Sequence, residues 1–248
     1  MKQSLQWVFG VHAVQAMLKT SAGKIQELRL QKGRDDQRFK KIQSMAEQQG
    51  VPTSWVLRSD LDTLADGQHQ GVAALCEGAD VQDENFLSDL LVSLDHPPLI
   101  LVLDGVTDPH NLGACLRSCD AAGVDVVVAP KDRSVGITPV VKKVACGAAE
   151  SVPLVVVTNL ARTLKFLQQQ GVWVVGTAGE AQQLIYEADL SGPLALVMGA
   201  EEKGLRRLTR ENCDLLVKLP MAGAVSSLNV SVASGVCLFE AVRQRARV

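Results

Sequence analysis

Short apolar runs separated by amphipathic stretches dominate the second half of the chain. The runs are rich in Val, Leu and Ile and lie at 99–103, 124–128, 154–157, 173–175, 194–198 and 215–219. Their apolar character is continuous rather than alternating, which is typical of strands buried on both faces of a parallel sheet. The stretches at 112–122, 139–149 and 160–169 have the length and the apolar face of helices. The pattern predicts an α/β domain over residues 98–248.

A long helix is expected at the end of the chain, over residues 229–245. Its apolar side chains recur at the spacing of a single helical stripe, formed by Val232, Val236, Phe239 and Val242. Such a stripe is expected to pack against another apolar surface.

A smaller α/β domain is predicted over residues 1–75. Strand candidates at 28–30, 52–56 and 72–75 alternate with helical patterns at 12–18 and 38–49, and Gly50 stands where the second helix should end. Residues 76–97 then carry six acidic side chains, no Lys or Arg, and Pro97-Pro98 near the boundary. This composition predicts an acidic linker between the two domains.

Composition places the 248-residue chain in the globular class, with 47% apolar and 21% charged residues. The net charge of −2 argues only weakly against nucleic acid, because the charge is unevenly distributed. Residues 1–75 carry +3, 76–97 carry −6 and 98–248 carry +1, so an RNA-binding face on a folded part stays open. The absence of a leader peptide and of an apolar run of about 18 residues predicts a soluble, cytoplasmic protein with no membrane partner.

The six cysteines show no Cys-x-x-Cys pair and no paired Cys/His spacing. Cys115 and Cys119 would share a helix face, but two ligands do not make a zinc site. We therefore expect buried, reduced thiols and no metal.

Three polar, glycine-bearing blocks follow strands of the predicted sheet. They read Asp108-Pro-His-Asn-Leu-Gly-Ala, Met198-Gly-Ala-Glu-Glu-Lys-Gly, and Leu219-Pro-Met-Ala-Gly running on to Ser226-Ser-Leu-Asn-Val-Ser. Ligands of parallel α/β sheets bind beyond the carboxyl ends of the strands, so the three blocks predict one site in an enzyme. No Gly-x-Gly-x-x-Gly follows the first strand and no P-loop is present, which excludes an ordinary dinucleotide or nucleoside-triphosphate site. A nicotinamide-dependent oxidoreductase is therefore not favoured.

The blocks resemble the motifs of the SpoU/TrmH group of S-adenosylmethionine-dependent RNA ribose 2′-O-methyltransferases, within the SPOUT superfamily. The matching stretches are 108–117, 197–204 and 219–233, and the resemblance extends to 142–153, 159–163, 9–14 and 69–72. Within the group it is greatest to the enzymes that modify a guanosine of bacterial 23S ribosomal RNA. The resemblance implies a deep trefoil knot in the C-terminal domain and a small, ribosomal-protein-like RNA-binding domain before it. Simple connectivity rules would have excluded a knot, so this expectation rests on the resemblance alone.

The resemblance also implies the site residues. The catalytic set would be Asn111, Arg117, Glu201, Ser227 and Asn229. The S-adenosylmethionine set would be Thr177, Gly199, Leu219, Met221 and Leu228. A homodimer is implied as well, in which Arg117 of one subunit serves a cofactor held by the other. Neither a metal nor DNA is implied.

Elementary chemistry leaves several of these roles with an alternative. Arg117 is expected to clamp an RNA phosphate and the developing alkoxide, since a guanidinium stays protonated. A role as base, or as an ordinary surface arginine of the helix, is the alternative. Asn111 could simply cap the helix that follows it. Glu201 would hold Arg117 or a backbone amide in place. Of Ser227 and Asn229, we expect one to cap the last helix and the other to face the site.

The remaining alternatives concern packing and substrate. Leu219 and Leu228 could pack in the core, and this is compatible with lining a pocket, since such pockets are mostly apolar. His110 is not favoured as a base, and His12 and His69 are expected to face RNA or to be structural. RNA contact is expected from the basic cluster Lys32, Arg34, Arg38, Lys40 and Lys41. A tRNA 2′-O-methyltransferase and a non-catalytic RNA-binding factor in ribosome assembly are the alternative functions.

Overall fold

The computed structural model describes residues 5–34, 36–65, 69–77, 81–200 and 204–246. They belong to two compact units. Unit 1 comprises Met1–Asp80 and Lys142–Ser151, and unit 2 comprises Val81–Val141 and Val152–Val248.

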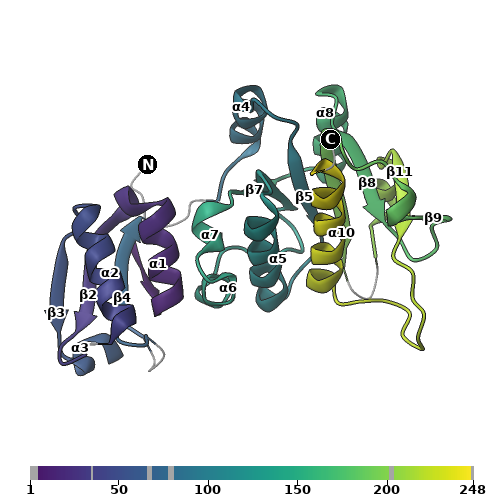
Figure 1. The fold of residues 1–248 in the computed structure, drawn as a ribbon. Coiled ribbons are helices and arrows are strands. Elements are labelled where there is room, and N and C mark those ends of the chain that lie inside the picture. Colours follow the sequence, from purple (N-terminus) through teal and green to yellow (C-terminus); the bar gives the residue numbers. More distant parts are fainter. Residues whose placement is uncertain (1–4, 35, 66–68, 78–80, 201–203, 247–248) are drawn as a thin grey trace. The chain divides into compact units, whose positions relative to one another are not determined.

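Unit 1 is built on a four-stranded mixed sheet in the order β1-β4-β2-β3. The strands are β1 (Leu5–Phe9), β2 (Ile25–Gln31), β3 (Thr53–Val56) and β4 (Val72–Glu77). Helices α1 (Val11–Thr20) and α2 (Gln37–Gln48) pack on one face of the sheet and share one apolar core with it (Figure 1). The turn η1 (Ala22–Lys24) and helix α3 (Arg58–Asp62) complete this part. Gly50 has a φ of 66°, the left-handed conformation expected of the residue that ends α2.

Unit 2 contains a seven-stranded sheet in the order β7-β6-β5-β10-β8-β11-β9, and all of its pairings are parallel. The strands are β5 (Leu99–Asp104), β6 (Val126–Pro130), β7 (Leu154–Val157), β8 (Trp173–Thr177), β9 (Gln183–Leu184), β10 (Leu194–Gly199) and β11 (Leu215–Lys218). Every residue of β5 and β6 is buried, as the continuous apolar runs predict. The parallel α/β fold is therefore confirmed.

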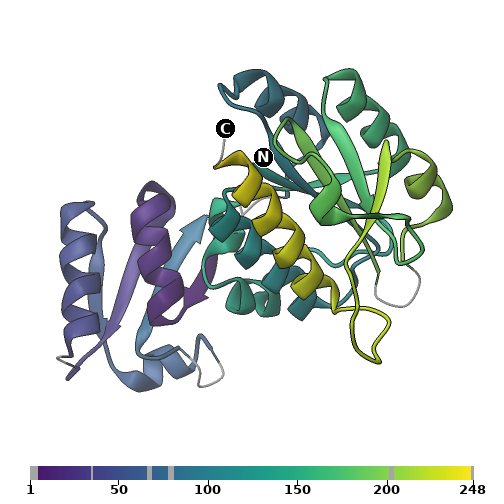
Figure 2. The same ribbon diagram turned by 45° about the vertical axis from the view of Figure 1, so that its right-hand side comes forward.

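Helices cover both faces of this sheet. They are α4 (Glu84–Ser93), α5 (Pro109–Ala122), α8 (Leu160–Gln169), α9 (Arg207–Glu211) and α10 (Val230–Arg245), together with the turn η2 (Ile185–Glu187). Residues of α4 and α8 share one core cluster with the strand residues Ile100 and Val102. Helices α5 and α10 lie side by side in both ribbon views (Figures 1 and 2). The last helix is thus present where the stripe predicts it.

The segment expected to be an acidic linker, residues 76–97, holds structure of its own. It begins with the end of β4 and continues into α4, which Asp83 caps by accepting hydrogen bonds from the backbone of Asn85 and Phe86. Leu87 is only 1% exposed in the core of unit 2. The acidic composition concealed this helix because its apolar face is short.

The single helix expected over residues 139–149 is two helices, α6 (Pro139–Ala145) and α7 (Ala148–Ser151). Cys146 and Gly147 between them have φ values of 54° and 100°, which no α-helix accommodates. A Cβ atom on Gly147 would lie 2.6 Å from the Cβ of Ala16 in α1. The break therefore lets residues 142–151 pack closely against α1 in unit 1, a tertiary cause that helical periodicity does not reveal.

Candidate active site

A cavity of about 250 Å³ lies beyond the carboxyl ends of β8, β10 and β11 in unit 2. We call it the strand-end cavity. All five residues expected to hold a cofactor line it, namely Thr177, Gly199, Leu219, Met221 and Leu228, and Ser227 lines it too. The second and third polar blocks of the sequence therefore meet at one place, as the parallel sheet predicts.

Close backbone approach shapes the wall of the strand-end cavity. A Cβ atom on Gly199 would lie 2.2 Å from the carbonyl carbon of Gly204 and 2.4 Å from the nitrogen of Leu205. Only glycine fits at such a distance, so the chain that leaves β10 returns directly onto the strand end. Thr177 is fixed nearby, because its hydroxyl donates to the carbonyl of Val197 at 3.3 Å.

The lining combines apolar and polar groups. Met198, Leu219, Met221 and Leu228 supply apolar surface, and Thr177, Ser226 and Ser227 supply hydroxyls. Leu219 is half-buried and Leu228 is 36% exposed, so neither is a fully buried core residue. A pocket of this mixed kind is suited to a small organic cofactor.

Charged side chains stand at the same cavity. Glu180 and Arg210 both line it and form an ion pair with each other, and Lys218 lines it as well. Sequence reasoning missed these three residues. Glu180 follows the glycine turn after β8, which was a usable signal, but Arg210 lies on the five-residue helix α9, which is too short to show a period.

A hydrogen bond joins the first polar block to the third. The Nδ2 of Asn229 donates to the Oδ1 of Asn111 at 2.9 Å. The Oδ1 of Asn229 accepts from the backbone nitrogen of Ser231 at 2.9 Å and so caps α10. Asn229 is therefore the capping member of the Ser227–Asn229 pair, while Ser227 faces the strand-end cavity.

Asn111 does not cap helix α5, contrary to the alternative given above. Asp108 is the cap, since its carboxylate accepts from the backbone nitrogen of His110 at 2.8 Å, and Pro109 opens the helix. Asn111 lies one turn further on, where its side chain reaches α10. The sequence correctly predicts a capped helix here, but the capping residue is Asp108, three residues before Asn111.

Arg117 lies on the exposed surface of α5 and is not among the described residues that line the strand-end cavity. It is six residues from Asn111, about 240° around a helix with 100° per residue, so the two side chains leave α5 in different directions. Glu201 lies outside the described residues. The structure thus brings Ser227 and the five cofactor candidates to the strand-end cavity and joins Asn111 to Asn229. Asn111, Arg117 and Asn229 are not among the described residues that line the cavity.

Cysteine chemistry is not supported at this site. All six cysteines are free, and none is among the described residues that line the strand-end cavity. Burial raises the pKa of Cys213 and of Cys237 to about 12, which keeps these thiols protonated. Over the described part of the chain, no three His, Cys, Asp or Glu residues gather as metal ligands would, and no helix is long and apolar enough to cross a membrane.

The basic cluster expected to contact RNA is exposed on unit 1 around the start of α2. Arg34 is the most ordered member: its guanidinium stacks 4.5 Å from the centre of the Phe39 ring and pairs with Asp36 at 2.9 Å. His69 is structural, since it is 2% exposed, accepts from the backbone of Gly71 and is bonded to Asp62 at 2.9 Å. His12 is exposed.

Comparison with known proteins identifies the family of each of the two regions. The SpoU rRNA Methylase family matches residues 98–239, and the family described as RNA 2′-O ribose methyltransferase substrate binding matches residues 7–82. The 23S rRNA (guanosine-2′-O-)-methyltransferase RlmB of Pseudomonas putida is 60% identical over 97% of both chains. RlmB of Escherichia coli is 57% identical over 97% of this chain and 99% of its own.

The fold has solved counterparts. The SpoU methyltransferase AviRb of Streptomyces viridochromogenes superimposes with a TM-score of 0.78 at 23% identity, covering 98% of this chain and 92% of its own. Structural similarity at 23% sequence identity supports a shared fold. Together with the two family matches and the identity to the RlmB enzymes, it shows that this chain belongs to the SpoU rRNA Methylase family.

Proposed function

We propose that this protein transfers a methyl group from S-adenosylmethionine to the 2′-hydroxyl of a guanosine ribose in 23S ribosomal RNA. The observation that carries the proposal is the 60% identity to RlmB of Pseudomonas putida over 97% of both chains. That identity spans the methylase region and the substrate-binding region together. A ribosomal RNA substrate also favours a cytoplasmic location.

The strand-end cavity fits the cofactor. Apolar side chains of Leu219, Met221 and Leu228 would pack against the adenine, beside the wall that Gly204 and Leu205 form against Gly199. Thr177 adds a hydroxyl beside Met198. When bound, S-adenosylmethionine supplies an electrophilic methyl group on a cationic sulfur.

The residues around Asn111 would position the ribose. Asn229 holds the Asn111 amide in place, and Ser227 faces the strand-end cavity from the same loop. A hydroxyl is a weak nucleophile, so its orientation and its developing negative charge have to be managed by the protein. We assign the charge to Arg117, whose fixed positive charge and forked donors suit an alkoxide and a neighbouring phosphate. Glu201 would orient Arg117 or a backbone amide.

A homodimer would complete this site. The stripe on α10 points outward, with Val232 and Phe239 each 51% exposed. The opposite side of the same helix is buried through Val230, Cys237 and Leu238. A helix that is apolar on both sides has a second surface to cover, which supports a second copy of the chain. We assign Arg117, which is exposed on α5, to the cavity of the partner, as the resemblance to the family implies.

The deep trefoil knot is part of the same proposal. It is supported by the family membership and by the tight return of the chain onto Gly199, beside which residues 219–228 line the same cavity. RNA contact by Lys32, Arg34, Arg38, Lys40 and Lys41 is supported by their exposure within the matched substrate-binding region.

The test is methyl transfer with labelled S-adenosylmethionine to large-subunit ribosomal RNA and to bulk tRNA, followed by digestion to nucleosides. Label in 2′-O-methylguanosine from ribosomal RNA, lost in Arg117→Ala and kept in Arg162→Ala, is the expected result. Arg162 is a suitable control because it is a surface arginine paired with Glu84 at 2.8 Å. Transfer to tRNA alone would make the tRNA enzyme the better assignment. Neither transfer nor cofactor binding would favour the non-catalytic RNA-binding factor.

A further inference from the structure

Asp104, the last residue of β5, is a buried carboxylate that none of the roles above uses. It is 1% exposed. Its hydrogen-bond donors within the described chain both belong to Arg206: the backbone nitrogen lies 2.9 Å from Oδ2 and Nε lies 2.5 Å from Oδ1. Burying a carboxylate is unfavourable unless it is paired and hydrogen-bonded. The pair therefore holds Arg206 at two points, one on the main chain and one on the side chain.

Arg206 follows the part of the chain that returns to the end of β10. Gly199, the last residue of β10, is paired in register with Asp104 of β5. The backbone nitrogen of Gly204 donates to the carbonyl of Ala200 at 2.8 Å, and Gly204 and Leu205 lie against Gly199 as described above. The contact between Arg206 and Asp104 thus ties the chain next to Gly204 and Leu205 to the end of β5.

This return forms part of the wall of the strand-end cavity. Gly199, Ala200, Gly204 and Leu205 line the cavity, whereas Asp104 and Arg206 are not among its described lining residues. Helix α9 starts immediately after Arg206, and its Arg210 lines the cavity too. The ion pair therefore holds the residue that lies between the cavity wall at Leu205 and helix α9.

We infer that Asp104 and Arg206 are positioning residues, whose ion pair holds Gly204 and Leu205 in the wall of the strand-end cavity and so sets its affinity for S-adenosylmethionine. The inference rests on the proposed function for the identity of the cofactor. Asp104 also begins the segment that leads to Asp108 and the start of α5. The same carboxylate therefore stands where the chain leaves β5 toward α5, the helix that carries Asn111.

The test compares Arg206→Ala, Arg206→Lys, Asp104→Asn and the double variant Asp104→Asn/Arg206→Ala by isothermal titration with S-adenosylmethionine alone. Arg206→Ala and Asp104→Asn should each weaken cofactor binding about tenfold, because small misplacements of binding groups are costly. Arg206→Lys should recover part of the loss. The double variant should bind no more weakly than the weaker single variant, since the two changes remove one shared interaction.

Arg162→Ala is the matched control, because it removes another arginine–carboxylate pair of unit 2 that lies between α4 and α8. Circular dichroism and RNA binding are measured on each variant. Weaker cofactor binding by a folded variant with unchanged RNA affinity supports the inference. Cofactor affinity within twofold of the wild type in Arg206→Ala and Asp104→Asn would overturn it. A wild type that binds no S-adenosylmethionine would instead overturn the proposed function.

Discussion

The strand-end cavity and helix α5 contribute to the same candidate site in different ways. The cavity is enclosed by three loops that follow neighbouring strands of one sheet, and contacts within the chain fix its wall at Gly199 and Thr177. Helix α5 sends Asn111 to the start of α10, but it leaves Arg117 on an exposed face. The five cofactor candidates thus meet at one cavity, whereas Arg117, to which we assign the developing charge, is not among the described residues that line it.

Arg117→Ala should have the largest effect on transfer. Removing a preorganised positive charge from a developing alkoxide lowers the rate by about 10²- to 10³-fold. Because Arg117 is not among the described lining residues, cofactor affinity should stay within twofold of the wild type. Single-turnover transfer and isothermal titration measure the two quantities. If Arg117→Ala lowered the transfer rate and the cofactor affinity together, helix α5 and the strand-end cavity would not have separate roles.

Gly199→Ala should weaken cofactor binding by disturbing the wall of the strand-end cavity. The added Cβ atom would meet backbone atoms of Gly204 and Leu205 at 2.2 to 2.6 Å, so the cavity wall must move. We expect cofactor binding about 100-fold weaker. Gly179→Ala is the control, since Gly179 lines the same cavity and its Cβ atom would meet nothing within 4 Å. Equal affinities of the two variants would contradict the account of the wall.

Phe239→Asp tests whether a second chain supplies Arg117 to the strand-end cavity. A charge in the centre of the outward stripe should raise the dimer dissociation constant at least about thirtyfold, as loss of an interface hot spot does. Transfer should fall with dissociation while the monomer still binds S-adenosylmethionine. Analytical ultracentrifugation measures the association, with Val92→Asp on the 81% exposed surface of α4 as control. An active monomer would remove the need for a partner.

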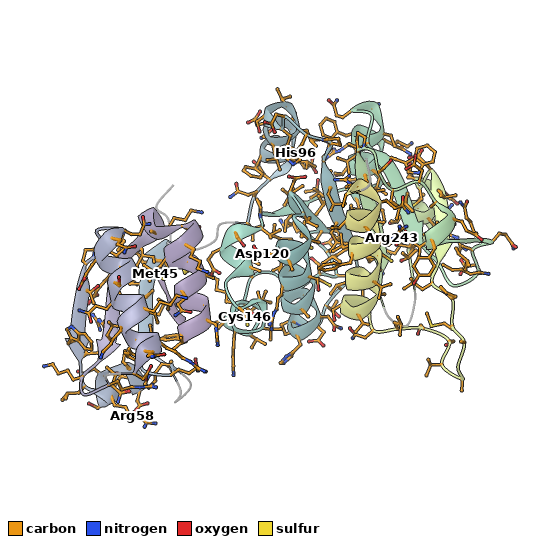
Figure 3. All side chains as sticks on the ribbon, viewed as in Figure 1. Met45, Arg58, His96, Asp120, Cys146 and Arg243 are labelled. Carbon is orange, nitrogen blue, oxygen red and sulfur yellow. The ribbon has the colours of Figure 1, made fainter. Side chains whose placement is uncertain are left out.

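The smallest effect is expected from pH at the opposite end of unit 2. His96 lies there, away from the loop of residues 219–229 (Figure 3). Hydrogen bonds to Asp95 and Asp125 raise the pKa of His96 above its ordinary value. Its contribution to stability is therefore complete below the pKa of the unfolded chain and is lost as the pH rises through the folded value.

Thermal unfolding between pH 5 and pH 9 checks this expectation. The melting temperature should fall slightly across the titration of His96 in the wild type, and His96→Gln should flatten that part of the profile. Cofactor affinity should be the same for both proteins at each pH. A matching change in affinity would mean that the two ends of the sheet are coupled.

Much of the fold could be predicted because burial on both faces leaves a direct mark on composition. The strand β7 coincides with the apolar run at 154–157, and α8 coincides with the amphipathic stretch at 160–169. Elements without such a mark were missed: β1, α3, α4, α9 and the two-residue strand β9 are short, partly exposed or acidic. The break at Cys146 and Gly147 depends on contact with α1, which local periodicity does not encode.

Some residues of the candidate site could likewise be placed from the sequence, and others could not. Residues that follow strands, such as Thr177 and Leu219, could be placed together because parallel strands end at one edge of a sheet. The direction of Arg117 could not, since residues on a helix point all around its axis and the start of α5 had to be known first. The pairing of Asp104 with Arg206 joins residues 102 positions apart, and no short motif announces it.

The most direct test of the account mixes the two defective proteins in one dimer. Arg117→Ala and Gly199→Ala chains are co-expressed with different tags, the mixed dimers are compared with each parent, and transfer to large-subunit ribosomal RNA is measured. At a cofactor concentration near the wild-type dissociation constant, each parent should keep only about 1% of wild-type activity. A random mixture should regain roughly one quarter of wild-type activity, because half of the dimers are mixed and each has one intact cavity served by an intact Arg117 of the other chain. A mixture that stays inactive would contradict the central claim and place Arg117 at the cavity of its own chain.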